Sequence, residues 1–180
     1  MTPTTGATQS APTTPTGAST TPPGATTQPG GTTQANPFDS ITFTIVPFSG
    51  GGIGAIGGGG GGLTALGGDS ALTATLFQAG SSSTPFQSIS LKTSDQPAWS
   101  SFAPQTLTTS LTTPVTATSL GSVTIALIPG TESPNILAIQ SIQVVLSSSS
   151  GMPAPVMLLN QSGLPLETLS PAHLSSTMPL

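Results

Sequence analysis

Apolar residues at every second position are the feature that most constrains the fold of this chain. In the segment ITFTIV, Ile41, Phe43 and Ile45 share one parity, and Thr42 and Thr44 share the other. This two-residue period is typical of a β-strand with one buried face. The same alternation returns in three further segments: 71–78 (ALTATLFQ), 85–92 (PFQSISLK) and 122–128 (SVTIALI). No segment has a convincing helical period, and an apolar sheet face must be covered by a second layer. The sequence therefore predicts an all-β fold, an antiparallel β-sandwich.

Two further segments refine the predicted sheets. The segment 135–147 changes parity part-way along: its apolar residues are Leu137 and Ile139, followed by Ile142, Val144 and Leu146. A β-bulge near Gln140 or Ser141 would correct the register, and this is the interpretation we favour; burial on both faces is the alternative. The segment 105–117 carries leucines among threonines, so we predict an edge strand there, with Pro114 marking its end.

Composition divides the chain into three parts. Residues 2–34 contain no charge and no large aliphatic or aromatic side chain, so they cannot offset the entropy of ordering their backbone. We therefore predict that residues 1–36 form a disordered stalk or linker rich in Thr, Pro and Gly. The sandwich domain is expected at 37–148, with a glycine-rich loop at 49–68. Residues 149–180 read as a Pro-rich, apolar tail that either lies against the sandwich or a partner, or is free.

Formal charge is almost absent from the sequence. The six charged residues are Asp39, Asp69, Lys92, Asp95, Glu132 and Glu167. The surface must therefore consist largely of Ser, Thr, Gln, Gly and Pro, and it has no positive field to attract phosphates, which excludes nucleic-acid binding.

The chain has no cysteine, so disulfides and zinc-thiolate sites are excluded. No transmembrane segment is expected, because no window approaches about 18 consecutive apolar residues, and the opening MTPTTGATQS does not resemble a signal peptide.

The segment GIGAIG matches the dinucleotide fingerprint G-x-G-x-x-G through Gly52, Gly54 and Gly57, directly after a predicted strand. A true fingerprint needs a helix after its third glycine, and an acidic residue about 20 positions beyond the motif. Here the chain continues in glycine toward another strand, and Asp69 comes too early. We interpret the match as part of a long connection between two strands.

Catalytic side chains are few and scattered. His173 is the only histidine and lies in the Pro-rich tail, and Lys92 is the only lysine. General acid–base chemistry needs such groups to converge in a cleft, and a serine nucleophile would have to recruit His173 from the tail. We therefore expect that the chain is not an enzyme and needs no cofactor.

Three residues are the candidates for ligand contact. Among metal ions, calcium fits the available oxygen ligands best, and the loop aspartates Asp69 and Asp95 are the residues that would hold it. The alternative is that each aspartate bonds the backbone of its own turn. Trp99 is the only tryptophan; it is either a stacking platform for a sugar or lipid, or a core or rim residue, and we favour the second interpretation.

The order of motifs carries a family resemblance. The segments ITFTIV, GGDSALTATLF, FQSISLK, SDQPAW and AIQSIQVVL follow one another between residues 38 and 147. In this order they resemble the PLAT/LH2-like β-sandwich modules appended to many bacterial surface and secreted proteins. The resemblance implies an eight-stranded sandwich that binds proteins or lipids, in some members with calcium at loop aspartates. Such modules often have a tryptophan near the place of Leu137, and their glycine-rich loop is shorter, so the resemblance supports the fold more than the ligand.

These observations predict a non-catalytic β-sandwich module, extracellular or at a cell surface, that acts in adhesion or in binding a protein, lipid or glycan. With so few charges, its contacts should depend little on salt. Two alternatives remain open. One is a structural subunit of a larger assembly, such as a virion or a surface layer, formed by self-association. The other is an accessory domain of a longer secreted enzyme.

Overall fold

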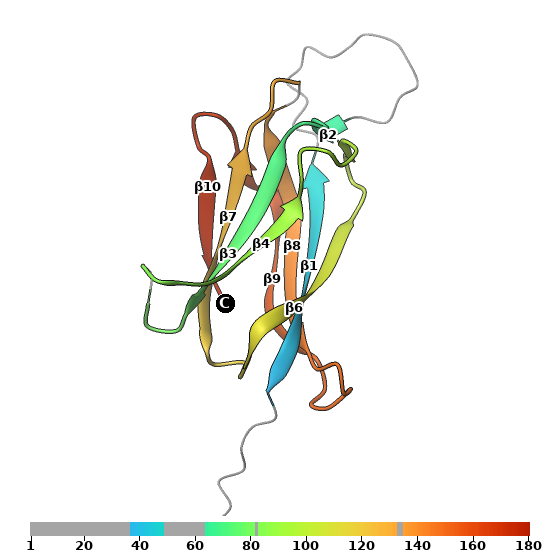
Figure 1. Ribbon diagram of the computed structural model, residues 1–180. Coiled ribbons are helices and arrows are strands. Elements are labelled where there is room, and N and C mark those ends of the chain that lie inside the picture. The colour runs from blue at the N-terminus through green and yellow to red at the C-terminus, as the bar shows by residue number, and fades with distance from the viewer. Residues whose placement is uncertain (1–36, 49–63, 82, 133–134) are drawn as a thin grey trace, which may run out of the picture. The chain divides into compact units, whose positions relative to one another are not determined.

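The computed structural model describes residues 37–48, 64–81, 83–132 and 135–180, and these residues form two antiparallel sheets packed face to face (Figure 1). The ten strands of the described chain are β1 (Phe38–Phe48), β2 (Thr64–Leu66), β3 (Ala71–Gln78), β4 (Pro85–Lys92), β5 (Trp99–Ser100), β6 (Gln105–Val115), β7 (Leu120–Ile128), β8 (Leu137–Ser147), β9 (Val156–Leu169) and β10 (Ser175–Pro179). The predicted all-β sandwich is confirmed. Within the described ranges, no helix is long and apolar enough to cross a membrane.

The strand order defines which strands lie at the edges. One sheet has the order β6-β1-β8-β9 and the other has the order β10-β7-β3-β4, while β2 and β5 form a separate two-stranded ribbon. All the pairings are antiparallel. The edge strand β6 lies near β4, and the edge strand β9 lies near β10. The sandwich therefore has two sides where the sheets end, which we call the β6/β4 side and the β9/β10 side.

The alternating residues of the sequence form the core. Ile41, Phe43 and Ile45 of β1 point inward and are buried, while the threonines between them are half-exposed. The opposite sheet contributes its own alternating set from β3 and β7, including Leu72 and Ile125. Because each inward residue is fully withdrawn from water, its apolar area stabilises the fold by roughly 25 cal/mol per Å².

The parity change in β8 is a β-bulge at Gln140, as the sequence predicts. Val46 of β1 is paired with Ser141, but its neighbour Pro47 is paired with Ile139, so Gln140 has no partner across the ladder. The extra residue returns the strand to register, and both halves of β8 therefore direct their apolar side chains into the core. The predicted edge strand is confirmed too: β6 ends at Val115, one residue after Pro114.

The C-terminal segment differs from expectation. Residues 149–180 are not a tail, because β9 and β10 complete one sheet each. Prolines are tolerated here because β9 is an edge strand. In addition, the ladder with β8 passes directly from Ser162 to Glu167, so that residues 163–166, including Pro165, stand outside the register. The sandwich accordingly extends well beyond residue 148.

Part of the expected loop 49–68 is ordered structure. Residues 64–66 form β2, which pairs with β5 through Leu66 and Trp99. The predictions for residues 1–36 and for the glycines of the GIGAIG motif concern parts of the chain that lie outside the described residues.

Hydroxyl groups cover the outer faces of both sheets. Four of them, from Thr177, Thr124, Thr75 and Ser88, form a row across β10, β7, β3 and β4. The outer two pairs are hydrogen bonded, at 2.7 Å between Thr124 and Thr177 and 3.1 Å between Thr75 and Ser88. On the other sheet, β1 and β6 are joined in the same way by two threonine pairs, Thr42–Thr108 and Thr44–Thr106. These hydroxyl rows are polar without being charged.

Candidate functional site: a pocket on the β6/β4 side

The β6/β4 side is closed at one end by a single side chain. The amide nitrogen of Gln87 on β4 donates to the carbonyl oxygen of Ser110 at 3.2 Å, and its oxygen accepts from the main-chain N–H of Thr112 at 2.9 Å. Ser110 and Thr112 belong to β6. The Gln87 amide thus bonds the edge of β6 as the main chain of a neighbouring strand would.

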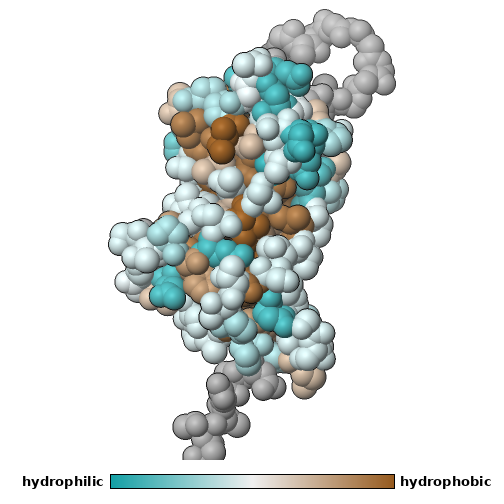
Figure 2. All heavy atoms as spheres, in the orientation of Figure 1, coloured by the Kyte–Doolittle hydropathy of each residue, from teal (hydrophilic) through white to brown (hydrophobic). Residues whose placement is uncertain are grey.

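Further along the same side, a pocket of about 290 Å³ opens between the two sheets. Its walls come from β1, from the end of β4, from the segment 96–99 and from the start of β6. The lining residues are Phe43, Ile45, Leu91, Gln96, Pro97, Ala98, Trp99, Gln105, Thr106 and Leu107. None of these ten residues carries a formal charge. On the face drawn in Figure 2, hydrophobic residues lie along the middle of the molecule with more hydrophilic residues on both sides.

Trp99 forms part of this pocket while remaining mostly buried. Its exposed fraction is 7%, and it is part of the hydrophobic core cluster. The structure therefore agrees with the favoured interpretation of a core or rim residue, and the indole contributes to the pocket wall at the same time. An open stacking platform would need a far larger exposed ring face.

Lys92 holds the loop that frames the pocket. Its side chain is completely buried. The ammonium donates to four carbonyl oxygens: Gly68 at 2.6 Å, Ser70 at 2.8 Å, Thr93 at 3.2 Å and Gln96 at 3.3 Å. These carbonyls come from two loops, 67–70 and 93–96, and the second continues directly into the pocket wall. Lys92 therefore links both loops at one point.

A local irregularity of β4 turns Lys92 inward. Thr73 of β3 is paired with Ser90, but the preceding Leu72 is paired with Lys92, so Leu91 is the extra residue of a bulge. Both Leu91 and Lys92 are consequently buried, where strict alternation would place Lys92 in water. No pattern in the sequence signals this bulge, and by sequence alone Lys92 is only an isolated lysine.

Four of the six charged residues gather around this point. Burial holds the pKa of Lys92 below its ordinary value of 10.5, and the negative charges of Asp69, Asp95 and Glu132 act in the opposite direction. Glu132 lies close to the first loop, since a Cβ on Gly68 would come within 3.3 Å of its Oε2. A buried ammonium is costly unless it is hydrogen bonded and compensated, and this arrangement supplies both.

Asp69 is engaged by the β7–β8 connection. Its Oδ2 accepts from the main-chain N–H groups of Thr131 and Glu132 and from the Thr131 hydroxyl. The N–H of Glu132 is the main cause that holds the pKa of Asp69 below 3.8. Its Oδ1 is buried and has no hydrogen-bond partner among the described residues. A side chain at Gly130 would collide with this carboxylate, because a Cβ there would lie 2.0 Å from Oδ1.

Asp95 stays within its own turn, where its carboxylate accepts from the Thr93 hydroxyl, which lowers its pKa. The structure thus brings both calcium candidates to the same end of the sandwich, but each is bonded to a loop, and the nearby carbonyl oxygens of Gly68 and Gln96 already accept from Lys92. No group of three or more metal-ligating side chains occurs in the described part of the chain. Calcium binding at Asp69 and Asp95 stays a prediction.

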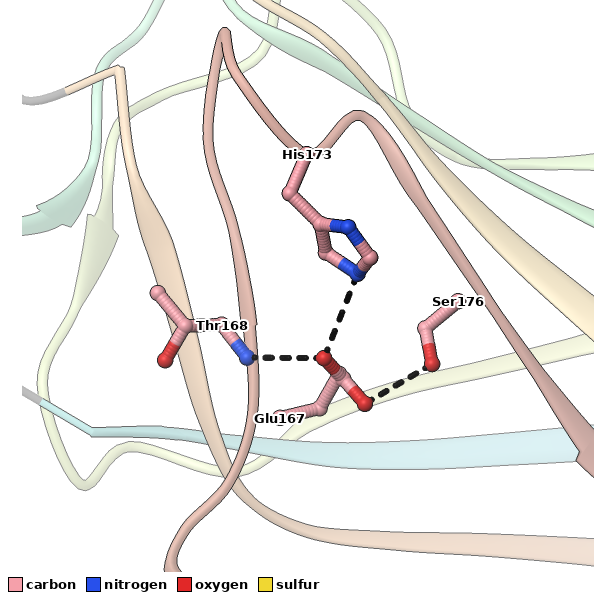
Figure 3. Close-up of polar contacts among 4 residues, drawn as sticks. All are labelled: Glu167, Thr168, His173 and Ser176. Atoms are coloured by element: carbon pink, nitrogen blue, oxygen red, sulfur yellow. Dashed lines mark hydrogen bonds and ion pairs between the residues drawn. The ribbon is translucent and has the colours of Figure 1, made fainter.

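His173 lies on the opposite side of the sandwich and has a carboxylate partner, Glu167 (Figure 3). Its Nε2 is 3.5 Å from Oε1 of Glu167, and the other carboxylate oxygen accepts from the Ser176 hydroxyl at 2.8 Å. The carboxylate therefore stands between the imidazole and the hydroxyl. In a serine-nucleophile triad the imidazole instead stands between the other two groups and takes the hydroxyl proton. This cluster links β9 to β10 and does not reproduce that order.

No protein-family model and no curated protein matched this sequence. The function is therefore inferred from the pocket, its framing loops and the surface around them.

Proposed function

We propose that this chain is a non-catalytic β-sandwich module, extracellular or at a cell surface, that binds an uncharged group of a protein, lipid or glycan in the pocket of the β6/β4 side. The observation that carries the proposal is the lining: a pocket of about 290 Å³ that combines apolar side chains with amide and main-chain groups and has no charged side chain. Such a combination is typical of binding sites in which apolar contact supplies affinity and a few polar groups fix orientation.

The pocket offers two kinds of contact. Leu107, Leu91 and Trp99 supply apolar surface, and Gln96 and Gln105 supply amide groups at the rim. The rim is held in place by Lys92, because its ammonium bonds the carbonyl oxygen of Gln96. A site fixed in this way loses little conformational entropy on binding. Because the contacts are uncharged, the affinity should change little with ionic strength, and a steep loss with added salt would contradict the proposal.

Trp99 gives the proposal a direct readout, since it is the only tryptophan and it lies in the pocket wall. The fluorescence of Trp99 would be followed during titration with neutral oligosaccharides, phosphatidylcholine vesicles and uncharged peptides. We expect at least one class to shift the emission. The variant Ala98→Phe, which fills the pocket, should abolish the response.

The matched control is Ala172→Phe in the exposed β9–β10 turn, which should leave the response intact. If both variants behave like the parent chain with every probe, the pocket is not the binding site and the proposal is wrong.

A second candidate function, a structural subunit that self-associates, is supported by a different surface. Ile128 and Leu174 are 57% and 46% exposed, and they lie close together because the N–H of Leu127 donates to the carbonyl oxygen of Leu174 at 2.7 Å. Figure 2 shows apolar atoms gathered at this end of β7 and β10. Exposed apolar clusters are common at contacts between subunits. Light scattering of the parent chain and of an Ile128→Ser, Leu174→Ser variant would test it: a parent chain that is monomeric at high concentration contradicts assembly.

A further inference from the structure

The free edge of β6 has unpaired main-chain groups next to the pocket, as far as the described residues go. In an antiparallel ladder, successive residues direct their N–H and C=O groups to opposite sides of the strand. Ser110 and Thr112 direct theirs away from β1, because these groups bond Gln87. The pairing of β1 with β6 is regular from Ser110 back to Gln105, so Thr108 and Thr106 point to the same free side.

Among the described residues, the main-chain N–H and C=O groups of Thr106 and Thr108 are unbonded on this free side. In the described part of the chain, no hydrogen bond joins the main chain of Thr106 or Thr108 to a group on the free side. The hydroxyl of Thr106 lies on the outer face of the sheet, where it bonds Thr44 at 3.2 Å. Thr106 nevertheless lines the pocket. It therefore presents its main chain to the pocket.

We propose that the stretch of β6 from Thr106 to Thr108 accepts an extended, uncharged peptide segment of a partner protein as an added β-strand, with an apolar side chain of that peptide in the pocket beside Trp99. This inference rests on the proposed binding function and names its ligand class. Main-chain hydrogen bonds supply affinity in such strand addition, and a pocket that takes alternate side chains supplies specificity.

The structure itself shows the bonding pattern that the peptide completes. The Gln87 amide already bonds one carbonyl and one N–H, two residues apart on the β6 edge. Thr108 and Thr106 continue the same row of donors and acceptors toward the pocket, at the usual rise of about 3.3 Å per residue.

The chemistry of the lining selects the kind of peptide. A charged side chain placed against Leu107, Leu91 and Trp99 would lose its hydration without gaining a partner, because none of the lining residues is charged. An apolar side chain flanked by Ser, Thr, Gln or Gly meets both the apolar walls and the amide rim. A glycan or a lipid would fill the pocket but would leave the donors and acceptors of the β6 edge without strand-like partners.

The test uses the full chain and a defined probe. Twelve-residue peptides without charged residues, displayed on phage, are selected against the parent protein, and the best binder is synthesised with a single N-methyl group at each position in turn. Strand addition predicts an alternating result. N-methylation at the two positions, two residues apart, whose N–H groups bond the carbonyl oxygens of Thr106 and Thr108 should weaken binding about tenfold each, because each removes one hydrogen bond to β6, while the position between them should change it less than about twofold.

Two variants test the same point from the protein side. Thr108→Pro removes an N–H from the free edge without removing a bond to β1, and proline is tolerated at such positions. It should weaken the peptide about tenfold, whereas Thr108→Val, which keeps the N–H, should bind like the parent. Should the proline variant fail to fold, the N-methyl series alone decides.

The outcomes separate the two proposals. An alternating N-methyl pattern, with loss of binding in Ala98→Phe, supports strand addition. Equal sensitivity at all positions overturns it, as does failure to select any peptide. If neutral oligosaccharides or phosphatidylcholine vesicles shift the Trp99 emission in the parent but not in Ala98→Phe, and no peptide binds, the pocket function stands and strand addition is wrong. If Ala98→Phe alters the response to none of the probes, both are wrong.

Discussion

The chain crosses from one sheet to the other on both sides of the sandwich, but by connections of different length. On the β9/β10 side the chain itself crosses from one sheet to the other, through a turn in which Ser170 and His173 exchange two hydrogen bonds of 2.9 Å. Glu167 and Ser176 add a side-chain link just beyond it. On the β6/β4 side the connection from β4 to β6 is longer and includes β5. Gln87 is the one side chain among the described residues that bonds β4 to β6, and a pocket follows where this bridge ends.

We infer from this difference that the β9/β10 side serves stability and the β6/β4 side serves binding. Exposed strand edges invite unwanted pairing, and proteins usually cover or bridge them. Here the short β9–β10 turn covers one side, and Leu169 beside it is fully buried. The other side is left accessible over a short stretch, where its position is controlled by Lys92 and the two loops that it links.

The largest expected effect comes from matched leucine truncations on the two sides. Leu169→Ala should lower the free energy of unfolding by about 3 kcal/mol, because it leaves a cavity in a site with no exposure. Leu107→Ala on the pocket wall should cost about 1 kcal/mol, because that side chain is only half-buried. Urea denaturation of both variants measures the difference. If both variants lost the same free energy of unfolding, the two sides would be packed alike and the contrast between them would be wrong.

The next largest effect is expected for Lys92→Met, which keeps the length of the side chain and removes its charge. The carbonyl oxygen of Ser70 would be left buried without its donor, so the free energy of unfolding should fall by about 2 kcal/mol. The Trp99 emission should also change, because the loop 93–98 leads into that residue. A variant with parental stability and emission would mean that Lys92 does not hold the pocket wall.

A smaller effect is expected for Gln87→Leu. This substitution removes the bridge to Ser110 and Thr112 but buries no new charge, so the loss should be about 1 kcal/mol. Amide hydrogen exchange at Thr112 should accelerate, while the exchange of Ser170 and His173 on the other side stays unchanged. Acceleration on both sides would mean that the sides do not open independently.

The smallest effect is expected from acid. Because the pKa of Asp69 is lower in the folded chain than its ordinary value of 3.8, its carboxylate stabilises the fold above that value. As the pH falls below 3.8 toward the folded pKa, the unfolded chain takes up the proton first, and this stabilisation is lost. Urea midpoints measured between about pH 5 and pH 2 should fall less steeply in Asp69→Asn than in the parent. Parallel curves would show that Asp69 does not contribute.

Local pattern was enough to predict much of the sandwich. The strands around Ile41, Leu72 and Ile125 follow from alternation alone, and the bulge at Gln140 follows from a change of parity. Such signals are local and need no knowledge of which strands pair. The prolines of the last segment obscured β9 and β10. Pro165 stands outside the ladder register and Pro179 lies at the end of an edge strand, so each strand forms although its sequence pattern is interrupted.

The candidate site was much less accessible to sequence reasoning. The sequence favours Trp99 as a core or rim residue, and its 7% exposure agrees. Its neighbours in the pocket come from four separate segments and depend on which strands are the edges. The role of Lys92 depends on a bulge at Leu91, which a single-residue shift in pairing creates. Gln87 acts through the main chain of another strand, where Ser110 lies 23 residues further along the chain. Contacts between such distant residues produce no repeating pattern in the sequence.

Because uncharged hydroxyl rows cover much of the outer faces, added salt should act on only one region of this molecule. Water binds the outer row of Thr177, Thr124, Thr75 and Ser88 through neutral hydroxyl groups. Dissolved ions therefore find no charge–charge interaction to screen along this row. Four of the six charges lie instead around the loops beside the pocket. A rise in ionic strength should therefore change little over most of the exterior, and its small effect should be confined to the exposed carboxylates of those loops, because the buried hydrogen bonds of Lys92 that hold the pocket wall are hardly screened.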